Sequence, residues 1–206
     1  MLSISKEKLM ERPPMDVTKL EFDADVMLSG LQRWVVCESP SYDPTAVNRM
    51  QEIAAHDLAV MGANVERITP HPLAGDCVRA RFPHPESGAP GILILGHMDT
   101  VHPIGTLDKL PIRRDGNLCY GPGIADMKGG NYLALEAIRQ LGAIGAQTPL
   151  PITVLFTSDE EIGSPYTRDL IESEARRAVA VLVPEPARRG NGVTSGRYAV
   201  ARYNVS

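Results

Sequence analysis

Several features that define other classes of protein are absent from this chain of 206 residues. It has no long basic run and its formal net charge is −4, so neither nucleic acid nor an anionic membrane is an expected partner. Its longest apolar stretches, residues 92–95 and 178–183, are too short to cross a bilayer. The charged segment 1–14 lacks the apolar core of a secretory signal. We therefore expect a globular protein of the cytoplasm.

Cysteine is also scarce, and its spacing excludes two further classes. The three cysteines, Cys37, Cys77 and Cys119, are widely separated and form no C-x-x-C pair. This pattern argues against a disulfide framework and against a thiolate zinc site. We expect the three thiols to be small buried hydrophobic groups in a reducing compartment.

The hydrophobic pattern alternates between helical and strand-like segments. Asp43 can cap a helix that has Pro44 in its first turn and Gly62 at its end. The apolar spacing predicts core-facing stripes on this helix and on the helix after the glycine-rich loop; these are Val47, Met50, Ala54, Leu58 and Met61, and then Leu133, Ala134, Ala137, Ile138 and Leu141. His56 is expected on the surface.

Strands and helices alternate along most of the chain. Helices are also predicted over 25–36 and 164–177, and strands over 76–82, 92–95, 152–157, 178–183 and 198–205. The turn-rich segment 83–90 suggests a hairpin between the first two strands, and 178–183 reads as a buried strand. The order predicts an α/β fold, with a twisted, mostly parallel sheet and helices on both faces.

Polar clusters follow three of the predicted strands. They occupy residues 96–99, 158–161 and 184–186, directly after the strands at 92–95, 152–157 and 178–183. Ligands of open α/β sheets bind beyond the carboxyl ends of the strands. We therefore expect the three clusters to converge on one site.

The first cluster contains His97 and Asp99, which have the chemistry of a metal ligand and its support. Imidazole is a common zinc ligand, and a carboxylate usually holds its other nitrogen. Residues i and i+2 of an extended segment face the same side, so Asp99 can orient His97. This short pattern is a weak signal when it stands alone.

The glycine-rich loop 121–130 contains Asp126. A dinucleotide site is excluded, because Asp126 replaces the third glycine and no strand leads directly into the loop. A phosphate loop is excluded too, because neither Ser nor Thr follows Lys128. A tight loop with one carboxylate suits a ligand shared by two metals, although a helix-capping Asp is the alternative.

The adjacent pair Glu160 and Glu161 provides two carboxylates that point in different directions. One can bind metal while the other acts as a general base toward water, although a solvated acidic turn is the alternative. Glu185 lies between two prolines, which stiffen the backbone and fix where its carboxylate points.

Together, these residues give the chain a specific resemblance to a known family. From about Leu31 onward it resembles the two-zinc exopeptidases and deacylases, which include glutamate carboxypeptidase, acetylornithine deacetylase, succinyl-diaminopimelate desuccinylase and aminoacylase. The resemblance rests on residues 96–101, 120–130, 157–164 and 184–186. The amino-acid sequence of residues 121–126 and 194–196 most resembles that of the bacterial glutamate carboxypeptidases.

The resemblance implies a site for two Zn²⁺ ions, with Co²⁺ or Mn²⁺ as alternatives. His97 and Glu185 would bind one ion, Glu161 would bind the other, and Asp126 would bridge the two. Asp99 would orient His97, and Glu160 would be the general base. The resemblance also implies a cis peptide bond after Asp126.

The sequence departs from this family in one respect. The family takes a further ligand from a histidine near the end of a longer chain, so the second metal has only Asp126 and Glu161 here. The other histidines are His56, His71, His84 and His102. The nearest to the site in the sequence is His102, but its position relative to His97 does not fit the order of ligands that the family has. We expect an N-terminal fragment, with a leader at 1–22, part of the catalytic domain at 23–198 and the start of a dimerisation domain at 199–206. The complete protein would form a homodimer.

Three functions remain open. The first is a carboxypeptidase that releases a C-terminal amino acid such as glutamate from a small peptide. The second is a deacylase of N-acyl amino acids, of the acetylornithine or succinyl-diaminopimelate type. The third is an inactive, truncated chain that only binds metal.

Overall fold

The computed structural model describes residues 16–187, 190 and 192–195. In this part of the chain the helices are α2 (Ala24–Val35), α3 (Pro44–Val60), α4 (Gly129–Ala143) and α5 (Arg168–Arg176), and the short helical turns are η1 (Val17–Lys19), η2 (Thr106–Asp108), η3 (Ile124–Lys128) and η4 (Glu160–Ile162). The strands are β1 (Asn64–Ile68), β2 (Cys77–Arg81), β3 (Gly91–His97), β4 (Arg113–Asp115), β5 (Leu118–Tyr120), β6 (Ile152–Thr157) and β7 (Ala178–Leu182). None of the helices in this part is long and apolar enough to cross a membrane.

Five of the strands form one sheet in the order β1-β2-β6-β3-β7. β3 pairs in parallel with β6 on one side and with β7 on the other. β2 pairs antiparallel with both β1 and β6, so it alone runs against the other four strands. The predicted α/β fold with a mostly parallel sheet is confirmed.

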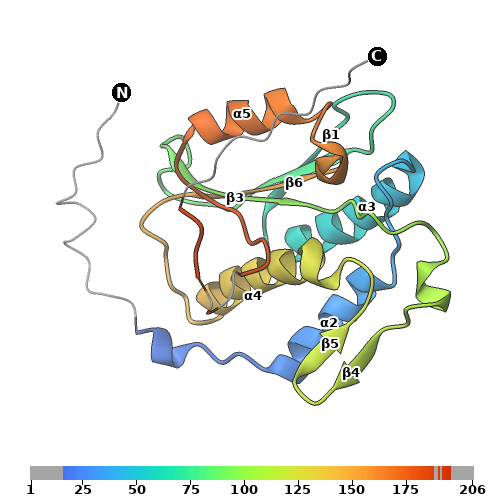
Figure 1. The fold of residues 1–206 in the computed structure, drawn as a ribbon. Helices are drawn as coiled ribbons and strands as arrows, with labels where there is room; N and C mark the ends of the chain where they lie inside the picture. Colours follow the sequence, from blue (N-terminus) through green and yellow to red (C-terminus); the bar gives the residue numbers. More distant parts are fainter. Residues whose placement is uncertain (1–15, 188–189, 191, 196–206) are drawn as a thin grey trace.

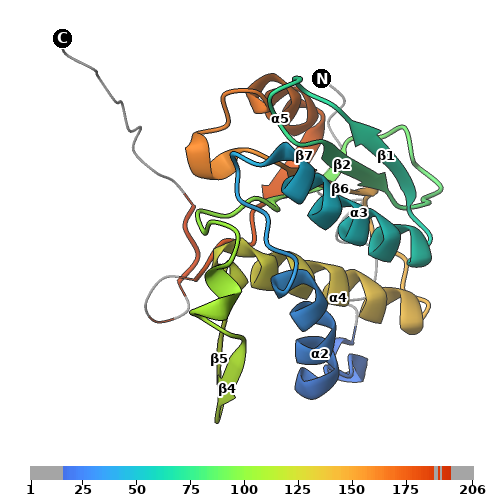
Figure 2. The ribbon, with the colours of Figure 1, turned by 90° about the vertical axis from the view of Figure 1, so that its right-hand side faces the viewer.

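Helices cover both faces of this sheet, as predicted. α2, α3 and α4 lie on one face and α5 lies on the other (Figures 1 and 2). The larger core is on the three-helix face, where Trp34 meets Tyr132 and Phe156 edge to face. On the other face, Leu93 and Leu155 pack against Leu170 and Ile171 of α5. Burying these side chains is the main force that fixes the layers.

The α3 prediction is confirmed in detail. Asp43 caps the helix by accepting a hydrogen bond from the Ala46 N–H at 2.9 Å, and Pro44 is its first residue. Val47, Met50, Ala54 and Leu58 are fully buried, and Met61 is partly buried. His56 is exposed, as expected.

The predicted packing of two elements was wrong. There is no hairpin between β2 and β3, because β6 lies between them and pairs with both. β7 is a strand, but it is not buried: it has only β3 as a neighbour within the described residues, and Val179, Val181 and Leu182 are exposed.

The helices after the glycine loop and after η4 also differ from expectation. The buried side chains of α4 are Asn131, Tyr132, Leu135 and Glu136, whereas Leu133 is exposed. Ala134 and Ile138 of the predicted stripe pack partly buried against the core, as expected, whereas the most buried positions include the polar Asn131 and Glu136. α5 begins later than predicted, because the Asp159 carboxylate accepts hydrogen bonds from the N–H groups of Tyr166 and Thr167 and holds them in a turn.

Some strands were not predicted, and some predictions cannot be compared with the structure. β1 and the β4–β5 hairpin were missed, because their residues show little apolar alternation. The predicted strand 198–205 and the domain start at 199–206 lie outside the described residues. Most of the predicted leader does as well.

Candidate metal and catalytic site

The candidate site lies at the carboxyl ends of three parallel strands. His97 is the last residue of β3, Glu160 and Glu161 follow β6, and Glu185 follows β7. Asp126 comes from η3, in the glycine-rich loop before α4. These are the predicted clusters, and the parallel pairing brings them to one edge of the sheet.

His97 is the centre of this group and is only 1% exposed. Its Nδ1 lies 3.0 Å from the carbonyl oxygen of Asp99 and 3.4 Å from Asp99 Oδ1. Because a carbonyl oxygen only accepts hydrogen bonds, Nδ1 is the donor, and Nε2 is left facing the site.

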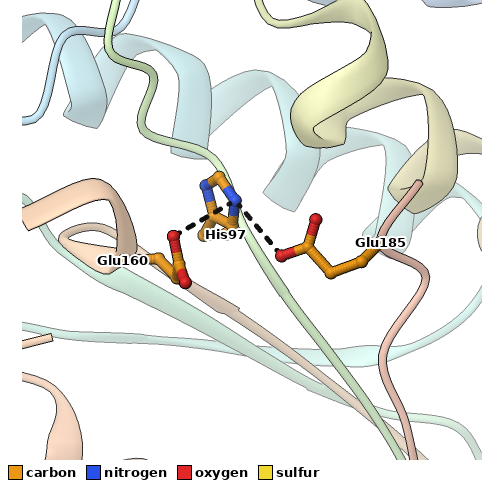
Figure 3. A group of neighbouring side chains, drawn as sticks. All are labelled: His97, Glu160 and Glu185. Carbon is orange, nitrogen blue, oxygen red and sulfur yellow. Dashed lines mark ion pairs between the residues drawn. The ribbon is translucent and has the colours of Figure 1, made fainter. Parts of the chain in front are cut away.

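Three carboxylates surround His97 Nε2. It lies 3.0 Å from Asp126 Oδ1, 3.8 Å from Glu160 Oε2 and 3.7 Å from Glu185 Oε1. Figure 3 shows Glu160 and Glu185 approaching the ring from opposite sides. A neutral imidazole nitrogen among carboxylates is a favourable arrangement when a cation lies between them.

Two sets of ligand atoms are close enough to hold a metal ion. One consists of His97, Glu160 and Glu185, and the other of His97, Asp126 and Glu161, with all atoms of a set within 4.8 Å of one another. All five residues named from the sequence as ligands or base are therefore together. How they divide between two ions remains a prediction.

Asp99 is a buried residue that supports the site. It is fully buried, and its carboxylate accepts hydrogen bonds from Ser41 Oγ at 2.6 Å, from the Glu160 N–H at 3.2 Å and from the Glu161 N–H at 3.1 Å. It therefore fixes the turn that carries both glutamates as well as contacting His97. The sequence predicts only the second of these tasks.

Crowding of negative charge shifts the pKa values at the site. Burial lowers the pKa of His97, but the hydrogen bond and charge of Asp99, followed by the charge of Glu160, raise it to about 9. Burial, followed by the charge of Asp126, raises the pKa of Glu161 to about 7 and also raises that of Glu185. The carboxylates therefore oppose one another's ionisation, and cations would relieve this repulsion.

The backbone around Asp126 is shaped by close approaches. The Asp126–Met127 peptide bond is cis, as the resemblance implied. Gly123 has φ +64°, and a Cβ at Gly130 would lie 1.7 Å from the carbonyl oxygen of Pro184. Glycine at 130 thus lets the start of α4 pack against the residue before Glu185.

Lys128 anchors this loop to α2. It is 1% exposed, and its Nζ donates hydrogen bonds to the carbonyl oxygens of Trp34 at 3.1 Å and Cys37 at 2.7 Å. Burial lowers the pKa of Lys128 to about 8, against the charges of Cys37 and Glu38. The sequence predicts no such anchor, because both contacts join residues more than 90 positions apart.

Three more supporting residues were missed. Ser41 binds Asp99, Asn131 Nδ2 donates to the carbonyl oxygen of His97 at 2.7 Å, and Gln51 Nε2 donates to the carbonyl oxygens of Phe156 and Thr157 at 3.2 and 2.9 Å. Each contact joins residues far apart in the chain, so no local motif signals it. The polar identity of Asn131 and Gln51 within helices was the only available clue.

The other histidines do not join the site. His71 stacks on Tyr166, and His84 Nε2 lies 3.0 Å from the carbonyl oxygen of Thr148. Among the described residues, the candidate metal groups contain neither of these histidines, nor His56, nor His102.

Comparisons with known proteins place this fold and site among the peptidases. The sequence pattern of peptidase family M20/M25/M40 matches residues 93–204, which include all six predicted site residues. The chain belongs to this family.

Two curated relatives illustrate the range of activities in it. The chain is 47% identical to carboxypeptidase G2 from Pseudomonas sp. (strain RS-16) over 104 residues, which cover 50% of this chain and 25% of that protein. It is 36% identical to acetylornithine deacetylase from Salmonella arizonae over 103 residues, which cover 48% of this chain and 26% of that protein. The chain thus matches about a quarter of the length of these relatives.

Solved structures show the same fold at low identity. Human carnosine dipeptidase 1 matches with a TM-score of 0.69 and 21% identity, over 80% of this chain and 39% of that chain. The metallo-carboxypeptidase Sso-CP2 from Sulfolobus solfataricus matches with a TM-score of 0.65 and 20% identity, over 81% of this chain and 38% of that chain. These likenesses support the fold assignment.

Proposed function

We propose that the protein is a metal-dependent hydrolase of amide bonds and releases a C-terminal amino acid, such as glutamate, from a small peptide or N-acyl amino acid. The observation that carries this proposal is the convergence of three part-exposed carboxylates, those of Asp126, Glu160 and Glu185, on the Nε2 of one buried histidine. The family membership and the 47% identity to a carboxypeptidase support it.

The side chains at the site fit divalent metal ions. Within the described residues, the ion pairs of Asp99, Asp126, Glu160 and Glu185 all go to His97, which offers at most one positive charge. One imidazole with several carboxylates suits Zn²⁺, with Co²⁺ or Mn²⁺ as alternatives. We assign His97, Asp126, Glu161 and Glu185 as the residues that would hold the metal. The ions, when bound, would supply Lewis-acid activation of water and of the scissile carbonyl group.

The protein residues around the site then have distinct tasks. Glu160, whose side chain is 50% exposed, accepts the proton of the attacking water and passes it to the nitrogen of the breaking C–N bond. The products are a carboxylate and a free amine. Asp99 holds the Nδ1–H tautomer of His97 and, through the N–H groups of Glu160 and Glu161, the position of the base. Asn131 holds the backbone of His97.

The test is a substrate panel with the protein expressed from its complete gene and supplied with zinc. We expect release of the amino acid from N-acyl-glutamates or from dipeptides. No release from any of them, at full metal occupancy, would refute the proposal. One zinc per chain without turnover would instead support a protein that only binds metal, the third function left open by the sequence.

A deacylase is the second candidate, favoured by the 36% identity to acetylornithine deacetylase. The same catalytic groups would serve it, because both reactions hydrolyse an amide. Comparison of acylated ornithine and diaminopimelate with acylated glutamate separates the two. Dimerisation of the complete protein remains a prediction, for which sedimentation measurements are the test.

A further inference from the structure

A pocket of about 360 Å³ adjoins the candidate site on the side of Glu161. It lies between residues 40–43, which precede α3, residues 100, 101, 103 and 104, which follow β3, and η4. Its volume is within the range of about 300–1,000 Å³ that is typical of small-molecule sites. Glu161 belongs both to this lining and to one of the candidate metal groups, so the pocket opens beside the reacting centre.

The pocket is lined mainly by apolar side chains that water reaches. Tyr42 is 85% exposed, Val101 is 65% exposed and Ile104 is 54% exposed, and Pro103 and Ile162 complete the apolar wall. Single exposed hydrophobic residues are ordinary, but several around one hollow mark a binding surface. Their position next to the candidate metal groups identifies the substrate as the natural occupant.

The charges of the lining decide which part of the substrate fits. Among the described residues that form the pocket, none is Lys, Arg or His, while Asp43 and Glu161 are acidic. Asp43 is engaged as the cap of α3. A substrate carboxylate would find no cationic side chain in this lining, so we place the carboxylate of the released amino acid outside the pocket. The part of the substrate left for the pocket is the acyl side.

We propose that this pocket binds the acyl part of the substrate and selects acyl groups that are bulky, apolar and uncharged. This inference rests on the proposed amide hydrolysis at the His97 site and narrows its substrate class. An acetyl group offers this lining only one methyl group to bury, and a succinyl group brings a second carboxylate. Tyr42, Val101 and Ile104 are therefore specificity-determining residues.

The first experiment measures kcat/KM for acetyl, hexanoyl, benzoyl and succinyl derivatives of both glutamate and ornithine, using the zinc-loaded protein from the complete gene. We expect the hexanoyl and benzoyl compounds to exceed the acetyl and succinyl compounds at least tenfold. Ile104→Lys should lower kcat/KM for hexanoyl and benzoyl substrates roughly tenfold and raise it for succinyl substrates. Leu118→Lys is the matched control, because Leu118 is an exposed residue of β5 outside the pocket.

The second experiment separates this inference from the proposed function. Calorimetric titration of the zinc-loaded protein with N-hexanoyl-glutamate and N-acetyl-glutamate measures binding without requiring turnover. If no acyl amino acid is hydrolysed but the hexanoyl compound binds more tightly and Ile104→Lys abolishes the difference, the pocket stands and the proposed function fails. If acyl amino acids are hydrolysed with no preference among acyl groups, or if Ile104→Lys and Leu118→Lys behave alike, the pocket assignment is overturned and the proposed function stands. Coverage of the pocket by another polypeptide segment would give this second result.

Discussion

Asp99 and Asp126 are both carboxylates in contact with His97, but they lie in opposite environments. Asp99 is fully buried and accepts three hydrogen bonds from protein donors. Asp126 has a side chain that is 56% exposed, and its ion pair within the described residues goes to His97 alone. The first therefore belongs to a buried support that the described residues provide, and the second to the part-exposed carboxylates of the candidate metal groups. Function should be sensitive to the second region, and stability to the first.

The largest effect should come from Glu160 in the exposed region. Glu160→Gln keeps the shape but cannot accept a proton, so we expect kcat to fall by about 10²–10⁴-fold with zinc content unchanged. Steady-state kinetics and metal analysis of the purified variant check this. Loss of zinc with the substitution would show that the roles of Glu160 and Glu161 are exchanged.

The next effect should come from Asp99 in the support. Asp99→Ala leaves Ser41 Oγ and the N–H groups of Glu160 and Glu161 without their acceptor, so unfolding free energy should fall by about 2–4 kcal/mol. Zinc affinity should also fall, by about 10–100-fold. Denaturant titration and a competitive chelator assay measure the two quantities.

Ser41→Ala sharpens the same test, because it removes one of the three donors to Asp99 and leaves the carboxylate in place. We expect the free energy of unfolding to fall by about 1 kcal/mol, and the zinc affinity to change less than in Asp99→Ala. Equal effects of the two substitutions would contradict the view that Asp99 holds the glutamate turn.

Lys128 tests whether the Asp126 loop depends on its anchor to α2. Lys128→Met removes the hydrogen bonds to Trp34 and Cys37, and we expect a loss of about 1–3 kcal/mol of unfolding free energy. Lys109→Met is the control, because Lys109 is exposed. Thermal unfolding of both variants gives the comparison, and indistinguishable melting curves would argue against an anchoring role.

The prediction with the smallest expected effect on activity concerns Cys77 of β2, which lies next to Ser158 behind the glutamate turn. Burial raises the pKa of Cys77 to about 12, and its thiol contacts Ser158 Oγ at 3.8 Å. Since the thiolate is the reactive form, alkylation of Cys77 in the folded protein should be about a thousandfold slower than that of a thiol with a pKa near 9. Mass spectrometry after iodoacetamide treatment at pH 8 should find Cys119 modified before Cys77. Equal rates would mean that this side of the sheet opens readily.

The same shift gives a pH dependence of stability. The folded protein holds the proton of the Cys77 thiol more tightly than the unfolded chain does. The contribution of this pKa shift to the free energy of unfolding is therefore fully present below about pH 9 and is lost as pH rises toward 12. The decline over this range should be shallower in Cys77→Ala. Denaturant titrations of both proteins at pH 8 and pH 10 measure the difference.

Much of the local structure could be predicted from the sequence. The Asp43 cap with the apolar spacing after it predicted α3, and the β-branched run at 152–157 predicted β6 at its observed bounds. The predicted site residues gather at one sheet edge because each motif directly follows a strand or opens a helix. A local pattern is enough when neighbours in the chain determine the conformation.

The sequence by itself thus determined the α/β class, the helices and strands with clear periodicity, and the chemistry of His97, Asp126, Glu160, Glu161 and Glu185. The tertiary structure decided which strands pair, so that β6 separates β2 from β3 and β7 is exposed. It also decided the support of the site, since Ser41 reaches Asp99 across 58 positions and Lys128 reaches Trp34 across 94. Such contacts leave no mark on local periodicity, because burial and hydrogen-bond satisfaction depend on segments that only the packed fold brings together.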